Sequence, residues 1–202
     1  MVENPTTKWM NPMSPNRYGP PRGSIDWVVV HTQEATSTAE QVTDNVLMNP
    51  NAQVSYNTVV GDRQTIEVVP CSHSPWAAAN ANTRADHLLF AGTFAAWAAD
   101  KWLSTDTTDG INESAMLTRG AIWTAWRCQE RDIPVVWVGG TGTKPPARKG
   151  ICGHVDLGAW GGGHTDPGNG FPRDEFMDRV RIAYNGEDPA WNAVMVEFTS
   201  FP

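Results

Sequence analysis

Two of the five histidines lie in one glycine-rich segment, residues 153–172, where the chain can turn sharply. They are His154 and His164, and Asp166 follows them within the sequence HTDPG. Imidazole nitrogens and a carboxylate oxygen are donors that zinc uses in catalytic sites, where a fourth position is left for water. The residue types and their spacing therefore make a metal site one interpretation of this segment.

These residues also have a purely structural interpretation. The sequence HTDPG is a turn signal by itself, because Asp, Pro and Gly each favour turns. His31 ends an apolar run, residues 24–31, at the kind of strand end where α/β folds place functional groups. A histidine at the edge of the core can equally be held by the backbone. From spacing alone, the turn and the metal site stay open as alternatives.

The other histidines and the cysteines give weaker signals. His73 lies in the loop sequence PCSHSPW, where a structural role or a ligand contact is expected, and His87 begins a strand without a partner nearby. Cys71, Cys128 and Cys152 are odd in number and form no CxxC pair. We therefore expect no disulfide framework and synthesis in the cytosol, with Cys152 as a small buried residue.

Charge and composition exclude several classes of function. The 202 residues carry a formal net charge of −7 without a cluster of Lys and Arg, which argues against binding to nucleic acid or an anionic membrane. The hydrophobic share of 40% and the charged share of 18% are typical of a globular domain. The polar, proline-rich start predicts no signal peptide, and no apolar run reaches membrane-spanning length.

Strand-like and helix-like segments alternate along the chain. Apolar runs predict strands at residues 24–31, 87–92 and 135–138, and a β-hairpin within 54–70. Apolar spacing predicts helices at residues 37–49, 111–132 and 173–186. This order predicts an α/β fold with a central mixed β-sheet flanked by helices. We expect an irregular lead-in at 1–23, one domain at 24–184, and a tail or linker stump at 185–202.

Four sequence segments, in order, resemble a known family. WVVVHTQE, SYNTVVG, GHVD and HTDPGNGFP are similar to segments of the zinc-dependent N-acetylmuramoyl-L-alanine amidases, whose superfamily includes the peptidoglycan recognition proteins. The resemblance is strongest to the amidase domains of mycobacteriophage endolysins and covers residues 24–184. It implies hydrolysis of the amide between N-acetylmuramic acid and L-alanine in peptidoglycan.

The resemblance also implies roles for single residues. His31, His154 and Asp166 match the family's zinc ligands, so the implied cofactor is Zn²⁺. Tyr56 matches a catalytic tyrosine, and His164 stands where relatives often carry a lysine. Both would donate hydrogen bonds to the oxyanion, and His164 would also pass a proton to the leaving amine.

The chain departs from the family pattern at two places. Many relatives have a catalytic glutamate in a strand where this sequence has Leu89, which favours a mechanism that relies on Tyr56 and His164. The common sequence WHA reads WAA from Trp76, and His73 is a candidate substitute for the missing histidine. Trp160 either forms the floor of the substrate groove or packs its loop against the sheet. The candidate substrate-binding residues are His73, Trp76 and Trp160.

The resemblance implies bacterial peptidoglycan as the partner, together with other lysin modules if the chain is one domain of a larger lysin. A phage cell-wall lysin would be made in the host cytoplasm and act on the wall. The main rival is a non-catalytic peptidoglycan-binding module of the same superfamily. Such modules usually lack the third ligand, so Asp166 favours the enzyme. A generic zinc peptidase has little support, because the chain has no HExxH sequence.

Overall fold

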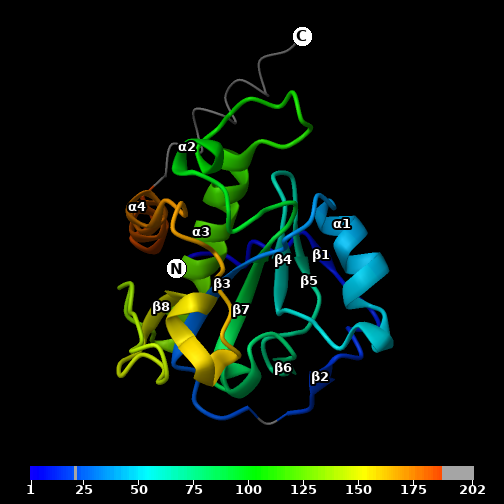
Figure 1. The fold of residues 1–202 in the computed structure, drawn as a ribbon, viewed down its shortest axis with the longest axis vertical. Coiled ribbons are helices and arrows are strands. Elements are labelled where there is room, and N and C mark those ends of the chain that lie inside the picture. Colours follow the sequence, from blue (N-terminus) through cyan, green and yellow to red (C-terminus); the bar gives the residue numbers. More distant parts are fainter. Residues whose placement is uncertain (21, 188–202) are drawn as a thin grey trace.

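A six-stranded sheet forms the centre of the computed structural model, which describes residues 1–20 and 22–187 (Figure 1). Its order is β1-β5-β4-β7-β3-β8. The bounds in that order are Lys8–Trp9, Thr65–Glu67, Thr58–Val60, Ala85–Phe90, Trp27–Thr32 and Gly150–Gly153. β4 and β5 pair antiparallel, as the predicted hairpin requires, and the other neighbours pair parallel. The predicted mixed sheet is confirmed.

The two faces of this sheet bury different clusters of side chains. Side chains alternate along a strand, so Val28 and Val30 of β3 pack beneath α3 (Glu113–Arg131). Val29 belongs to the apolar cluster on the opposite face, and His31 shares that face by the same alternation. The strand therefore presents His31 on the face that α3 does not cover.

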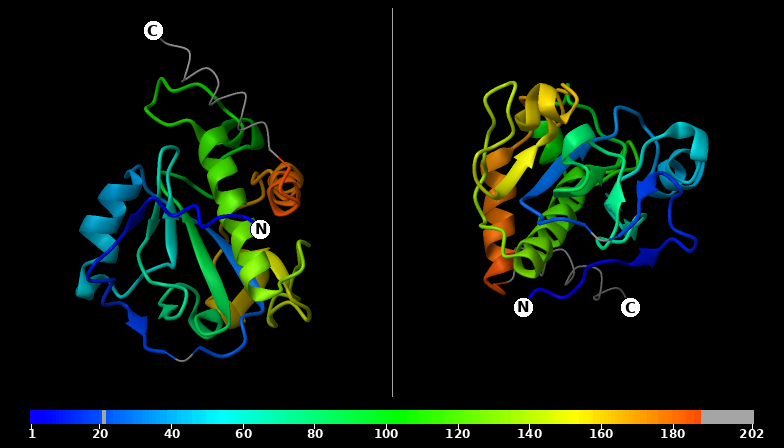
Figure 2. Two further views of the ribbon diagram at one scale, coloured as in Figure 1. Left: turned by 180° about the vertical axis from the view of Figure 1, so that it is seen from behind. Right: turned by 90° about the horizontal axis from the view of Figure 1, so that it is seen from below.

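Helices α3 and α4 (Arg173–Tyr184) lie side by side over one face (Figure 2). On the other face, α1 (Ala39–Val42) continues into a π-helical turn, Thr43–Leu47, and packs near β5. A short helix, α2 (Ala99–Trp102), precedes α3. The three predicted helices are confirmed, and the Thr38 side chain caps the first. No helix in the described part of the chain is long and apolar enough to cross a membrane.

The prediction of an irregular lead-in was wrong in part. β1 pairs with β5 at the sheet edge, and β2 (Arg17–Tyr18) pairs with β6 (Ser74–Pro75) in a second small sheet. Pro75 donates no N–H, yet it pairs with Arg17, so the high proline content did not prevent strand pairing. The prediction of a strand at residues 135–138 was also wrong in part, because this segment forms only an isolated β-bridge from Trp137 to Ile151. Most of the predicted tail, residues 188–202, lies outside the described residues.

Candidate functional site

Three side chains converge where β3 and β8 end. His31 Nδ1 lies 3.1 Å from Asp166 Oδ2, and His154 Nδ1 lies 3.2 Å from Asp166 Oδ1. One ligand atom from each residue lies within 4.8 Å of the others, and all three residues are buried. Within residues 1–20 and 22–187 no other group of this kind could hold a metal ion. Two imidazole nitrogens and a carboxylate oxygen form a donor set that fits zinc.

The outer nitrogens of both histidines are already engaged. His154 Nε2 lies 2.9 Å from the carbonyl oxygen of Gly161, which can only accept, so this nitrogen carries the proton. His31 Nε2 lies 3.0 Å from Nδ1 of His87. Because a neutral imidazole carries one proton, a ring with its proton on Nε2 would have the Nδ1 lone pair free for a metal ion, in place of the Nδ1 contact with Asp166 that the structure has. The contacts at the two Nε2 atoms therefore orient both rings with Nδ1 toward a metal ion.

A glycine-rich loop returns the chain so that Asp166 meets His154. His154 begins a 3-10 segment, His154–Gly161, directly after β8. The Val155 N–H then donates to the Asp166 carbonyl at 2.8 Å, which ties the two ends of the loop together. A Cβ at Gly153 would lie 2.5 Å from Pro167 Cδ, and Gly162 has a φ of +110°. These two glycines permit the close approach and the turn.

Burial and mutual contact set the charges of the group. Burial lowers the pKa of His31 to about 4, although its contact with Asp166 offsets part of this effect. Burial alone would raise the pKa of Asp166, but its hydrogen bonds with His154 and His31 hold that pKa well below the usual range. Around neutral pH the site therefore presents a neutral His31 and an ionised Asp166, which is the state a metal ion requires.

Of the three residues, His154 and Asp166 line a groove of about 420 Å³, together with Tyr56, Trp76 and His164. The Tyr56 ring packs edge-on against His31 with centroids 4.9 Å apart. Burial, with a smaller effect of the Asp166 charge, raises the pKa of Tyr56 well above its ordinary value, so its hydroxyl keeps its proton. The His164 ring stacks on His154 at 4.4 Å and is 64% exposed. Both side chains line the groove, and the protonated Tyr56 hydroxyl can donate a hydrogen bond to substrate.

Two of the predicted substrate-binding residues lie away from the groove lining. Trp160 packs edge-on against Trp27, with centroids 5.9 Å apart, a position that fits pinning of the loop to the sheet. His73 has its Nδ1 3.0 Å from Ser72 Oγ and does not line the groove. Leu89 pairs opposite His31 and is 1% exposed among apolar neighbours, so this position supplies no carboxylate.

Sequence reasoning missed several residues of the site. His87 showed no partner in sequence, yet it contacts His31 from the neighbouring strand β7. Glu34, Gln53 and Ala79 line the groove, and each has a positive φ, between 45° and 60°. Backbone strain of this kind concentrates at functional sites. No residue type indicates a positive φ at these positions, and β7 is buried on both faces, so alternation alone does not assign His87 to the face of His31.

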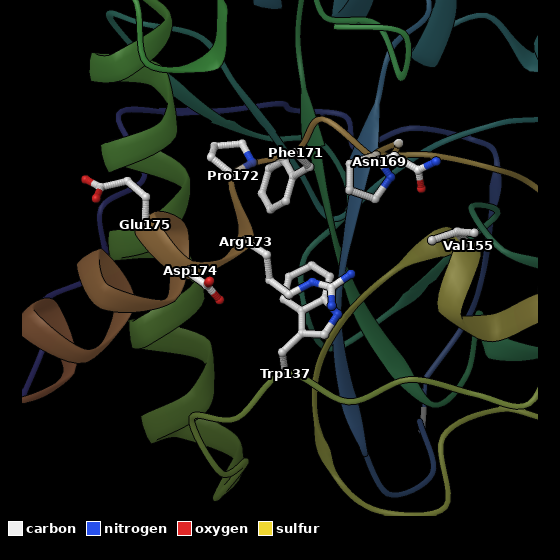
Figure 3. A pocket seen from close by; sticks show the side chains of 10 residues that line it. Trp137, Val155, Asn169, Phe171, Pro172, Arg173, Asp174 and Glu175 are labelled. Carbon is white, nitrogen blue, oxygen red and sulfur yellow. The ribbon is translucent and has the colours of Figure 1, made fainter. Parts of the chain in front are cut away.

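A second cavity, of about 470 Å³, lies beside the N-terminus of α4 (Figure 3). Trp137, Val155 and Arg173 are among its lining residues, and none of the three converging side chains is. The Arg173 guanidinium lies over the Trp137 ring, 4.9 Å from its centroid, and Phe171 packs near the same ring. Trp137 therefore lines this cavity while Arg173 and Phe171 pack against its ring.

The chain is similar in sequence to one known family and in fold to several solved structures. The family model described as N-acetylmuramoyl-L-alanine amidase matches residues 21–169. The hydrolase AmiA of Staphylococcus aureus, solved with its ligand, aligns with a TM-score of 0.65 at 16% identity, covering 88% of this chain and 82% of that one.

Two endolysin structures also share the fold. The endolysin LysCS of Clostridium intestinale, an N-acetylmuramoyl-L-alanine amidase, has a TM-score of 0.59 at 14% identity, covering 90% of this chain and 99% of that one. A mutant endolysin of Bacillus subtilis has a TM-score of 0.57 at 15% identity, covering 89% and 99%. No curated protein matches the chain significantly.

Proposed function

The chain belongs to the N-acetylmuramoyl-L-alanine amidase family, and from this premise we propose that it is a zinc-dependent hydrolase of peptidoglycan. Its substrate bond is the amide between N-acetylmuramic acid and L-alanine of the stem peptide. The proposal includes a role as a phage cell-wall lysin, because two structures that share its fold are endolysins.

One observation carries this proposal. One ligand atom from each of His31, His154 and Asp166 lies within 4.8 Å of the others, and His154 and Asp166 line a groove. Non-catalytic members of the superfamily usually lack the third ligand, whereas Asp166 is present and ionised. The outer nitrogens of His31 and His154 are also held by neighbours, which a metal ligand needs and a simple turn does not.

The residues of the groove can then act on the amide. When bound, zinc supplies Lewis-acid polarisation of the carbonyl and activation of a water. The Tyr56 hydroxyl is protonated and donates to the oxygen on which negative charge develops. His164 lies 4.0 Å from Asp166 through its Nδ1 and is open to the groove, so it can hold a proton for the leaving amine. Leu89 leaves no carboxylate opposite His31 for these tasks.

Mass spectrometry of the products tests this function directly. Digestion of mycobacterial-type peptidoglycan is expected to release intact stem peptides with new N-terminal alanine. Cleavage inside the stem would identify a peptidase instead. Zinc bound near one per chain without any wall cleavage would identify the rival binding module.

Replacing Tyr56 with phenylalanine is expected to lower kcat about 100- to 1000-fold, because one donor to the oxyanion is lost. The ring, and with it the edge contact to His31, is retained. Zinc content and KM should therefore stay near wild-type values, as measured by elemental analysis and steady-state kinetics on a defined muramyl peptide. An unchanged kcat would exclude this role of the hydroxyl.

Replacing His164 with lysine tests proton transfer against simple charge donation. A group that gives a proton to the leaving amine must hold that proton, so the rate falls where the group deprotonates as pH rises. An imidazole releases its proton at a lower pH than an ammonium group does. We expect the alkaline limb of the pH–rate profile to lie at higher pH in His164→Lys than in the wild type, measured on matched preparations. An alkaline limb at the same pH in both proteins would show that His164 does not carry the proton.

A further inference from the structure

His87 is a third buried histidine, beside His31 and His154, and the mechanism above does not use it. It lies in β7, is fully buried, and its Nδ1 is 3.0 Å from Nε2 of His31. The two rings are tilted by 42° with centroids 5.3 Å apart, so the contact is made through nitrogens and not by stacking.

The position of His87 is held by a neighbouring strand as well as by its own. The His87 N–H donates to Asn57 Oδ1 at 2.9 Å, and the Asn57 N–H donates to the His87 carbonyl at 3.1 Å. Asn57 is itself fully buried, and its Nδ2 donates to the Val69 carbonyl at 3.0 Å. The asparagine of the SYN sequence therefore fixes the backbone of His87 from both sides.

Coordination through His31 determines which proton each ring must carry. A metal ion at His31 Nδ1 requires a lone pair there, so the single proton of the neutral ring resides on Nε2. That N–H points at His87 Nδ1, which must then accept. The proton of His87 consequently resides on its own Nε2.

We propose that His87 is a positioning residue, which accepts the Nε2–H of His31 and so holds His31 with Nδ1 toward the metal ion. The inference rests on the proposed zinc site. A neutral acceptor orients the ligand without adding charge, whereas a carboxylate there would cancel part of the positive charge that zinc contributes. The Gly161 carbonyl orients His154 in the same way, by accepting a hydrogen bond from its Nε2–H.

Two amide substitutions of matched polarity separate this role from simple packing. In His87→Asn the side-chain oxygen falls near the position of Nδ1, whereas in His87→Gln the amide reaches the position of Nε2 and no acceptor faces His31. We expect His87→Gln to weaken zinc binding about 10- to 100-fold, the usual effect of losing a ligand's hydrogen-bond partner. His87→Asn should bind zinc nearly as tightly as the wild type.

The measurement is the zinc dissociation constant by competition with a chromogenic chelator, with thermal unfolding of the metal-free proteins as the control. Equal affinity of the Gln variant and the wild type would overturn the proposal, as would equal weakening in both variants at equal stability. Failure of the wild type itself to bind zinc would instead refute the zinc site of the proposed function.

Imidazole nitrogen NMR of the zinc-loaded wild-type protein tests the same proposal without a variant, and so covers the case in which a substitution prevents folding. Long-range ¹H–¹⁵N spectra report which nitrogen of each ring is protonated. We expect protonated Nε2 and unprotonated Nδ1 in both His31 and His87. A protonated Nδ1 in His87 would show that it donates to His31, which contradicts the proposal.

Discussion

Replacing Asp166 with alanine is expected to abolish both zinc binding and amide hydrolysis. Asp166 is the anionic member of the donor set and contacts both histidine ligands, at 3.1 Å from His31 and 3.2 Å from His154. Loss of a residue that only hydrogen-bonds to a metal ligand lowers metal affinity about 10- to 100-fold. Asp166 is a direct ligand, so its loss should lower zinc affinity by more than this. Elemental analysis after dialysis and the product assay on cell walls measure the two effects.

The matched control is Glu34→Gln, because Glu34 is the other carboxylate that lines the groove. Glu34 accepts hydrogen bonds from Thr32 Oγ1 at 2.5 Å and from the Ala95 N–H at 2.7 Å, and it is outside the three-residue cluster. The control should retain one zinc per chain. If Asp166→Ala also retained it with wild-type affinity, the assignment of Asp166 as a ligand would be wrong.

Replacing Asp86 with alanine is expected to lower the free energy of unfolding by about 3–5 kcal/mol, the usual cost of removing one partner from a buried ion pair. Asp86 in β7 has no exposed surface, and its carboxylate contacts Arg22 at 2.5 Å and Arg127 at 2.8 Å. Both arginine side chains are only 4% exposed, so their guanidinium groups would remain buried without their counter-charge. Denaturant unfolding followed by circular dichroism measures the change.

Asp178→Ala provides the control for an exposed ion pair. Asp178 contacts Arg181 at 2.5 Å on the surface of α4, where their side chains are 64% and 52% exposed. Exposed pairs of this kind contribute less than about 1 kcal/mol. Equal effects of the two substitutions would show that the buried cluster around Asp86 does not stabilise the fold as argued.

Arg22 shows that distant residues hold the predicted irregular lead-in. Its guanidinium donates to the Cys71 carbonyl and pairs with Asp86, so the segment just before β3 is anchored beneath the sheet. Proline content indicated irregular structure locally, but it carries no information about distant partners. The pairing of β1 with β5 depends on the same kind of long-range contact.

The central elements, by contrast, could be predicted because their signals are local. The apolar run that ends at His31 indicates a strand that is buried on both faces. The helical spacing in residues 111–132 indicates a helix that is buried on one face. The hairpin could be placed because Gly61 lies between two strand-like runs.

The sequence by itself determined the kinds of donor and the order in which they occur. His31 at a strand end, and His154 and Asp166 in one glycine-rich segment, followed from residue types and spacing, and the ordered motifs indicated the family. What only the tertiary structure decided is which nitrogens face one another. His87 contacts His31 from a strand more than fifty residues away, because parallel pairing of β3 with β7 sets their register. A one-residue shift in that register would turn His87 to the other face, and no local signal in the sequence encodes it.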